Sequence, residues 1–177
     1  MKYQPKNNNF ANRGMQLEKD LEQTNIYYLE NNVAIIYKKP TPITIKKVEY
    51  PNQKYTKIID GYFSKKSTTD YNGIYKGWYI DFEAKETKNN SLMLSTIHQH
   101  QINHLKKIKD HGGIAFLIIS FIQYNEVYLI LIEKINELID QNKKSITIDY
   151  IKNNGFLVPL AYQPRLDYLK IIKQLYF

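Results

Sequence analysis

Two acidic residues and one lysine form the pattern in this sequence that could do chemistry: Asp70, Glu83 and Lys85. Glu83 and Lys85 belong to residues 77–86, where apolar and charged residues alternate as they do on a β-strand. Side chains two positions apart on a strand share a face and lie about 6.6 Å apart along the chain. Asp70, on the turn that leads into this strand, can fold back beside Glu83. Two carboxylates placed together make a hard oxygen site that suits Mg²⁺.

Phosphodiester hydrolysis is the chemistry that such a site supports. The metal offsets the charge of a phosphate and can acidify a bound water, while a neighbouring lysine stabilises the pentacovalent transition state or orients that water. An acid-x-Lys pattern on a strand is, taken alone, more often a solvated ion-pair face than an active site, because a motif is a hypothesis until its context supports it. The rest of the chain must therefore decide between these interpretations.

The charge of the chain favours a polyanionic partner. Lys and Arg total 25 against 17 Asp and Glu, which gives a net charge of +8. Codon bias in an A/T-rich genome would also enrich Lys, Asn, Ile and Tyr, so basicity alone is a weak argument. The absence of cysteine excludes disulfides and thiolate zinc sites. No run reaches the ~18 apolar residues of a membrane span, and the first residues lack the apolar core of a signal peptide, so we expect a cytoplasmic protein without membrane contact.

The length and patterning predict one α/β domain over residues 1–177, with a mixed central β-sheet flanked by helices. Residues 1–11 are expected to form a flexible basic arm. The almost entirely apolar stretch 113–121 predicts a central strand buried on both faces, with 127–132 paired beside it. The other expected elements are helices at 12–31, 95–111, 133–141, 147–153 and 164–176, a strand at 33–37, and a turn at 71–73 before the strand at 77–86.

Residues 43–63 predict an unusually long β-hairpin. β-Branched and aromatic residues lie on both sides of YPNQ at 50–53, a typical turn sequence. Arms of about nine residues would extend ~30 Å, against a radius of gyration of roughly 16 Å for a chain of this size. The hairpin should therefore protrude from the domain or cross all of it. Two short core strands with an irregular loop are the alternative.

Several sequence blocks together resemble one protein family. In order along the chain they are NRGM at 12–15, LE at 17–18, KKPTPI at 38–43, YP at 50–51, STTDYNG at 67–73, DFEAKET at 81–87, HQHQI at 98–102 and PR at 164–165. This set is similar to the RecU-type Holliday junction resolvases of the PD-(D/E)xK nuclease superfamily, with Thr69 in place of the usual Pro. The resemblance covers nearly the whole chain, and it implies a PD-(D/E)xK nuclease-like fold in which 43–63 is a stalk that reaches toward the junction centre.

The resemblance also implies a function. The chain would be a Mg²⁺-dependent endonuclease, with Mn²⁺ as a substitute, that makes symmetric nicks in four-way junction DNA during recombination and repair. It would act as a homodimer, and its candidate partners include the strand-exchange recombinase and a branch-migration helicase. The implied metal ligands are Thr68, Asp70, Glu83 and Gln101, and Lys85 would stabilise the transition state. A restriction-type nuclease and a non-catalytic junction-binding modulator of the recombinase are the alternatives.

Basic residues along the chain are candidate phosphate contacts, which position a protein on DNA without reading its sequence. The predicted DNA-binding residues are Arg13, Lys38, Lys39, Lys46, Lys47, Lys54 and Lys57. Two acidic residues have secondary interpretations. Glu18 is expected to be a surface acid or to lie near the metal without binding it. Asp81 shares the face of Glu83 and could bind metal, but an ion pair with a nearby lysine is the favoured interpretation.

Overall fold

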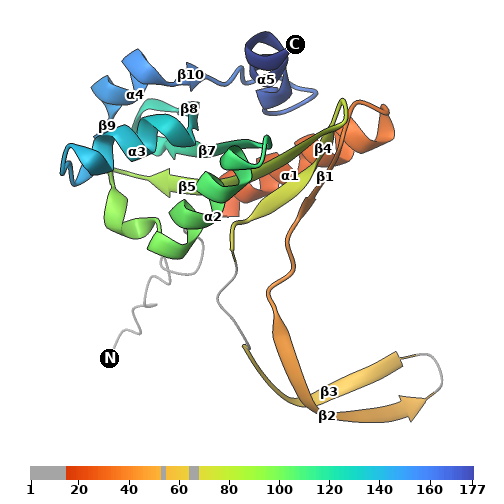
Figure 1. Cartoon of the computed structure of the whole chain (residues 1–177). Helices are drawn as coiled ribbons and strands as arrows, with labels where there is room; N and C mark the ends of the chain where they lie inside the picture. Colours follow the sequence, from red (N-terminus) through yellow and green to blue (C-terminus); the bar gives the residue numbers. More distant parts are fainter. Residues whose placement is uncertain (1–14, 53–54, 64–67) are drawn as a thin grey trace, which may run out of the picture.

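A six-stranded mixed β-sheet forms the centre of the computed structural model, which describes residues 15–52, 55–63 and 68–177. The strand order is β1-β4-β5-β7-β8-β10, and β5 and β7 run parallel while the other neighbours are antiparallel. The strands are Ile35–Lys38 (β1), Tyr71–Tyr75 (β4), Trp78–Thr87 (β5), Ile114–Phe121 (β7), Glu126–Leu131 (β8) and Phe156–Leu157 (β10). The predicted α/β class with a mixed sheet is therefore confirmed (Figure 1).

Helices cover both faces of the sheet. One hydrophobic cluster joins it to α1 (Met15–Glu30) and α5 (Tyr168–Tyr176), and a second joins it to α2 (Gln99–Asp110), α3 (Ile132–Asp140) and α4 (Ile148–Asn154). Strand β7 shows the division clearly, because Phe116 and Ile118 enter the first cluster while Leu117 and Ile119 enter the second. The strand is buried on both faces, as its apolar sequence predicts. No helix of the described residues is long and apolar enough to cross a membrane.

Strands β2 (Ile43–Asn52) and β3 (Tyr55–Phe63) form a separate antiparallel hairpin. Figure 1 shows it extending away from the sheet and its helices. Every residue of β3 is exposed, including large apolar side chains such as Ile58 and Phe63. The predicted protruding hairpin is confirmed, and the alternative of two core strands is wrong. Residues 53–54, between the two strands, lie outside the described residues, as does the predicted arm at 1–11.

Three local predictions differ from the structure. Residues 71–73, predicted as a turn, belong to β4, where Gly73 pairs with Ile36 on one side and Ile80 on the other. The helix predicted over 95–111 is a 3₁₀ turn at Leu94–Thr96 followed by α2, and the last helix begins at Tyr168 rather than at 164. A small two-stranded sheet of β6 (Ser91–Met93) and β9 (Ser145–Thr147) was not predicted, because strands of three residues leave little periodicity.

Gly73 provides a test of this arrangement, because β1 lies directly against it. A Cβ at this position would lie 2.6 Å from the Ile36 Cα and closer still to the Ile35 carbonyl oxygen, both of them backbone atoms that cannot move aside independently. We expect Gly73→Ala to lower the free energy of unfolding by about 3 kcal/mol or more in urea denaturation. Gly77→Ala is the matched control, since its Cβ would meet no atom within 4 Å and only its φ of +83° is unfavourable. Equal losses in the two variants would contradict the close approach of β1.

Candidate active site

Strand β5 directs Asp81, Glu83 and Lys85 toward one face of the sheet, whereas Glu86 lies on the other face and accepts a hydrogen bond of 2.8 Å from the Leu17 backbone N–H on α1. Phe82, between Asp81 and Glu83, packs on the opposite face, where its ring stacks on Tyr71 and Phe116 at centroid distances of 4.9 and 4.8 Å. Lys85 Nζ lies 2.6 Å from Glu83 Oε1, which shows that Glu83 and Lys85 share the face. Helix α2 covers this side of β5 and β7, and the Glu83 side chain has no exposed surface.

Asp70 lies beside these two residues through a backbone contact. Its Oδ2 accepts a hydrogen bond of 2.9 Å from the backbone N–H of Ala84, the residue between Glu83 and Lys85. The Asp70 carbonyl oxygen in turn accepts a hydrogen bond of 2.7 Å from the Lys39 backbone N–H. The segment before β4 is thus held against β5, and the structure brings Asp70, Glu83 and Lys85 together.

The Glu83 carboxyl is electrostatically unusual. Burial, and after it the charge of Asp70, raise its pKa from 4.5 to about 7, while the Lys85 ammonium and the Gln101 side chain lower it. Apart from the Lys85 ion pair, neither Glu83 oxygen meets a hydrogen-bond donor in good geometry within the described part of the chain. Buried carboxylate oxygens without such partners are costly, so this position favours either a proton or a cation.

Gln101 lies near Glu83 but already has a structural role. It is the third residue of α2, and its Oε1 accepts a hydrogen bond of 3.0 Å from the backbone N–H of His98, the residue that caps the helix. This contact is half of a capping box that fixes the start of α2. An amide carbonyl oxygen can accept a second interaction, so a metal contact remains compatible with the cap. The rings of His98 and His100 stack beside Gln101 with a centroid distance of 5.4 Å.

The oxygen donors here fit a magnesium ion. No group of three or more His, Cys, Asp or Glu side chains that could hold a metal gathers within residues 15–52, 55–63 and 68–177. Among these residues the site thus has two carboxylates rather than three, those of Asp70 and Glu83. The Thr68 hydroxyl and the Gln101 carbonyl could add neutral oxygens. Mg²⁺ is commonly bound by one or two carboxylates while water and substrate phosphate complete its coordination. The buried Glu83 carboxylate, which has the Lys85 ion pair but no hydrogen bond of good geometry among the described residues, is the feature that matches this requirement best.

The predicted DNA-binding residues lie in different surroundings. Lys38 is half-exposed and pairs with Glu18 at 2.7 Å and with Glu22 at 3.3 Å on α1. Lys39 is turned inward, where its Nζ lies 2.6 Å from Asp81, the ion pair expected for that acid. Lys46, Lys47 and Lys57 are exposed on the hairpin, and Arg13 and Lys54 lie outside the described residues.

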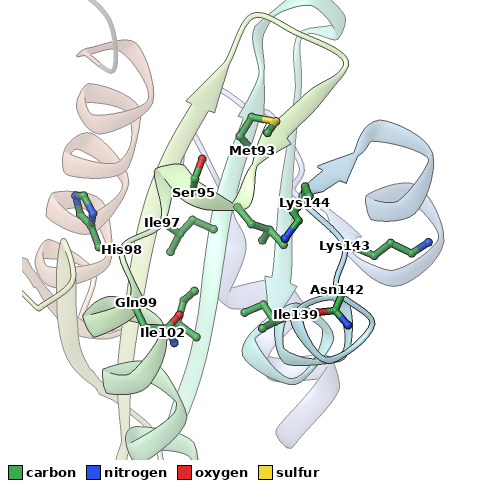
Figure 2. Close-up of a pocket in the computed structure, with 11 residues that line it drawn as sticks. Met93, Ser95, Ile97, His98, Gln99, Ile102, Ile139, Asn142, Lys143 and Lys144 are labelled. Atoms are coloured by element: carbon green, nitrogen blue, oxygen red, sulfur yellow. The ribbon is translucent and has the colours of Figure 1, made fainter.

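A cavity of about 530 Å³ lies next to the start of α2. Figure 2 shows it between residues from Met93 to Ile102 on one side and residues from Ile139 to Lys144 on the other. Its lining contains Lys143 and Lys144 but no acidic residue, and it includes neither Asp70 nor Glu83. Mg²⁺ is bound through anionic oxygen ligands, so the lining of this cavity does not suit it.

Sequence comparisons match one protein family over nearly the whole chain. The model of the family described as Recombination protein U matches residues 12–174. The Holliday junction resolvase RecU of Oceanobacillus iheyensis is 52% identical over 176 residues, covering 97% of this chain and 90% of the relative. The RecU proteins of Geobacillus thermodenitrificans and Staphylococcus aureus are 48% and 50% identical, covering 98% and 94% of this chain and 89% and 82% of their own length. The structure of Archaeoglobus fulgidus Hjc, a Holliday junction resolvase, has a TM-score of 0.49 and 13% identity, with 81% of this chain and 95% of that chain covered.

The raised pKa of Glu83 predicts how stability depends on pH when metal is removed with EDTA. Between pH 4.5 and about 7 the unfolded chain releases the Glu83 proton while the folded chain keeps it, so the wild type loses stability as pH rises through this window. Glu83→Gln cannot ionise and should avoid this loss. We compare the free energy of unfolding of Glu83→Gln with that of the wild type, measured by urea denaturation. From pH 4 to pH 8 this difference should shift by about 2–3 kcal/mol in favour of Glu83→Gln.

Glu30→Gln, at the exposed end of α1, removes the same charge and serves as the control. A stability difference between Glu83→Gln and the wild type that stays constant from pH 4 to pH 8 would contradict the buried position of the carboxyl.

Proposed function

The chain belongs to the RecU family of recombination proteins, and on this premise we propose that it is a Holliday junction resolvase, a Mg²⁺-dependent endonuclease that nicks four-way DNA junctions. The observation that carries the site assignment is the buried Glu83 carboxylate, which lies beside Asp70 and whose close charged partner among the described residues is Lys85 at 2.6 Å. A carboxylate pair with an adjacent lysine supplies what phosphodiester hydrolysis needs, which is a cation site and a positive group near the scissile phosphate.

Each residue of the site has a distinct part in the proposed reaction. When bound, Mg²⁺ supplies charge neutralisation at the phosphate and a more acidic water. Asp70 and Glu83 hold that cation, with Thr68 and Gln101 as further oxygen donors. The Lys85 side chain is 24% exposed and its Nζ lies 2.6 Å from Glu83 Oε1, so Lys85 is accessible to a phosphate oxygen and stabilises the charge that develops there. Mn²⁺, which accepts the same oxygen ligands, is expected to substitute.

Symmetric nicking of a junction requires two active sites related by a two-fold axis, whereas one chain carries one Asp70–Glu83–Lys85 set. We therefore propose that the protein acts as a homodimer, the commonest symmetric assembly. The hairpin of β2 and β3 is the element that can extend from the body toward a branch point, and its exposed Lys46, Lys47 and Lys57 suit contact with phosphates (Figure 1). The strand-exchange recombinase and a branch-migration helicase are the proposed protein partners.

Substrate choice tests the proposed function directly. With Mg²⁺, the protein should introduce paired nicks at symmetric positions of a four-way junction and leave linear duplex and single-stranded DNA intact, as resolved on denaturing gels with each strand labelled in turn. EDTA should abolish nicking. Equal cleavage of linear duplex would instead support a restriction-type nuclease. Junction binding without cleavage in any metal would support the non-catalytic modulator.

Asp70→Asn should separate cleavage from binding. The variant keeps the shape of the side chain but removes one anionic ligand, so the nicking rate should fall by about 100-fold or more. Junction affinity in EDTA, measured by gel shift, should change little because phosphate contacts dominate affinity. Asp140→Asn, at the exposed end of α3, is the control for the change in net charge. Full activity of Asp70→Asn would remove Asp70 from the site.

A further inference from the structure

Asp81 is a buried carboxylate that the proposed chemistry does not use. Its side chain has no exposed surface, yet it lies on the same face of β5 as Glu83. Its Oδ2 lies 2.6 Å from Lys39 Nζ, 3.0 Å from His104 Nε2 and 3.1 Å from the Tyr79 hydroxyl, and its Oδ1 accepts a hydrogen bond from the Thr69 hydroxyl. A carboxylate has about four lone-pair positions, so these contacts leave Asp81 saturated and unavailable to a metal ion.

Lys39 joins this network to the segment that carries two of the proposed metal ligands. Its Nζ lies 3.2 Å from the Thr68 hydroxyl and 2.5 Å from the Thr69 hydroxyl, in addition to its ion pair with Asp81. Its backbone N–H donates to the Asp70 carbonyl oxygen. Lys39 therefore holds Thr68–Asp70 through both its main chain and its side chain. Its side chain is only 14% exposed, which leaves little surface for a DNA phosphate.

The same network reaches the helix that carries the fourth proposed ligand. His104 lies one turn after Gln101 on α2, so the two side chains share a face of the helix. His104 contacts Asp81, and Gln101 lies close enough to Glu83 to lower its pKa. Asp81 and Glu83 on β5 therefore each face one residue of α2, His104 and Gln101 respectively. Asp81 fixes the distance between strand and helix at the site where Glu83 and Gln101 must converge.

We propose that Asp81 and Lys39 form a positioning pair for the cation site, and that Lys39 acts through this pair rather than by binding DNA. This inference rests on the proposed function, since it concerns the same ligands. The pair orients Thr68, Asp70 and Gln101, which arrive from two different segments. It also sets the charge of the site, because the Lys39 ammonium neutralises Asp81 and leaves the carboxylates of Asp70 and Glu83 available to the cation.

Asp81→Asn tests the positioning role without relying on catalysis. In this variant the Lys39 ammonium loses its counter-charge and remains beside Thr68, where it repels a cation. We expect the affinity of the metal-free protein for Mn²⁺, measured by isothermal titration calorimetry, to fall about 10-fold or more, the usual effect of removing a residue that orients metal ligands. Junction affinity in EDTA should stay within about twofold of the wild type. Asp149→Asn, in the exposed first turn of α4, is the matched control.

Lys39→Gln distinguishes a positioning lysine from a phosphate contact. A phosphate contact contributes about 0.9 to the slope of log affinity against log salt, so its loss would reduce that slope while leaving the nicking rate at saturating Mg²⁺ unchanged. We expect the opposite result: an unchanged slope for junction binding in EDTA and a nicking rate reduced by about 10- to 100-fold. Lys170→Gln, exposed on α5, removes the same charge away from the site. A reduced slope with full nicking would overturn the proposal.

The double variant Lys39→Gln/Asp81→Asn guards against misfolding as the explanation. It replaces the ion pair with two neutral amides, so neither partner is left as an unpaired buried charge. Its Mn²⁺ affinity should recover toward the wild type relative to Asp81→Asn alone, and an affinity no better than that of Asp81→Asn would overturn the charge-matching role.

If Asp81→Asn binds Mn²⁺ as the wild type does, the positioning role fails while junction cleavage by the wild type can still stand. If the wild type binds Mn²⁺ but cuts no junction, the proposed function fails while a loss of affinity in Asp81→Asn still supports the pair.

Discussion

Strand β5 lies between β4 and the parallel strand β7, and helix α2 covers one of its faces, so the side chains of Asp81 and Glu83 on that face have no exposed surface. A buried carboxylate is costly unless donors or cations compensate it. Asp81 and Glu83, two residues apart, meet this constraint in different ways. Asp81 is fully hydrogen-bonded, whereas Glu83 has the Lys85 ion pair but no hydrogen bond of good geometry within the described residues, and burial raises its pKa to about 7. This contrast separates a structural acid from a candidate metal ligand on one strand.

Much of the architecture follows from patterns that are local in the sequence. Alternation along 77–86 places Glu83 and Lys85 on one face, the apolar run 113–121 predicts a central strand, and the two apolar arms around YPNQ predict the hairpin. These predictions succeed because the periodicity of a strand depends only on the chain itself. The predicted helix start at 95 is wrong because a local capping signal lies where the chain forms a different turn. Ser95 is a typical capping residue, but the chain uses it in a 3₁₀ turn and caps α2 with His98 and Gln101.

The contacts that organise the candidate site are not local, and the sequence gives little indication of them. Lys39 and Asp81 are 42 residues apart in the sequence. They meet because Lys39 directly follows β1, Asp81 lies on β5, and one strand, β4, lies between β1 and β5 in the sheet. In the sequence Lys39 is one of two adjacent lysines, which is why it resembles a phosphate contact. Only the fold shows that Lys38 points to α1 and Lys39 to the interior. Gly73 is a similar case, because glycine serves both in turns and where two strands approach closely.

The hairpin obeys a different constraint from the rest of the chain. Two strands without a covering layer are marginally stable in water, and this pair exposes several large apolar side chains, among them Tyr50, Tyr55 and Phe63. A surface of this kind on an element that extends from the body indicates contact with a partner. Its lysines suit phosphates, whereas its isoleucine and aromatic side chains suit a second hairpin or exposed bases. A homodimer on a branched DNA would offer both kinds of contact at once, so the composition of the hairpin fits the second copy of the chain and the junction DNA acting together better than either one alone.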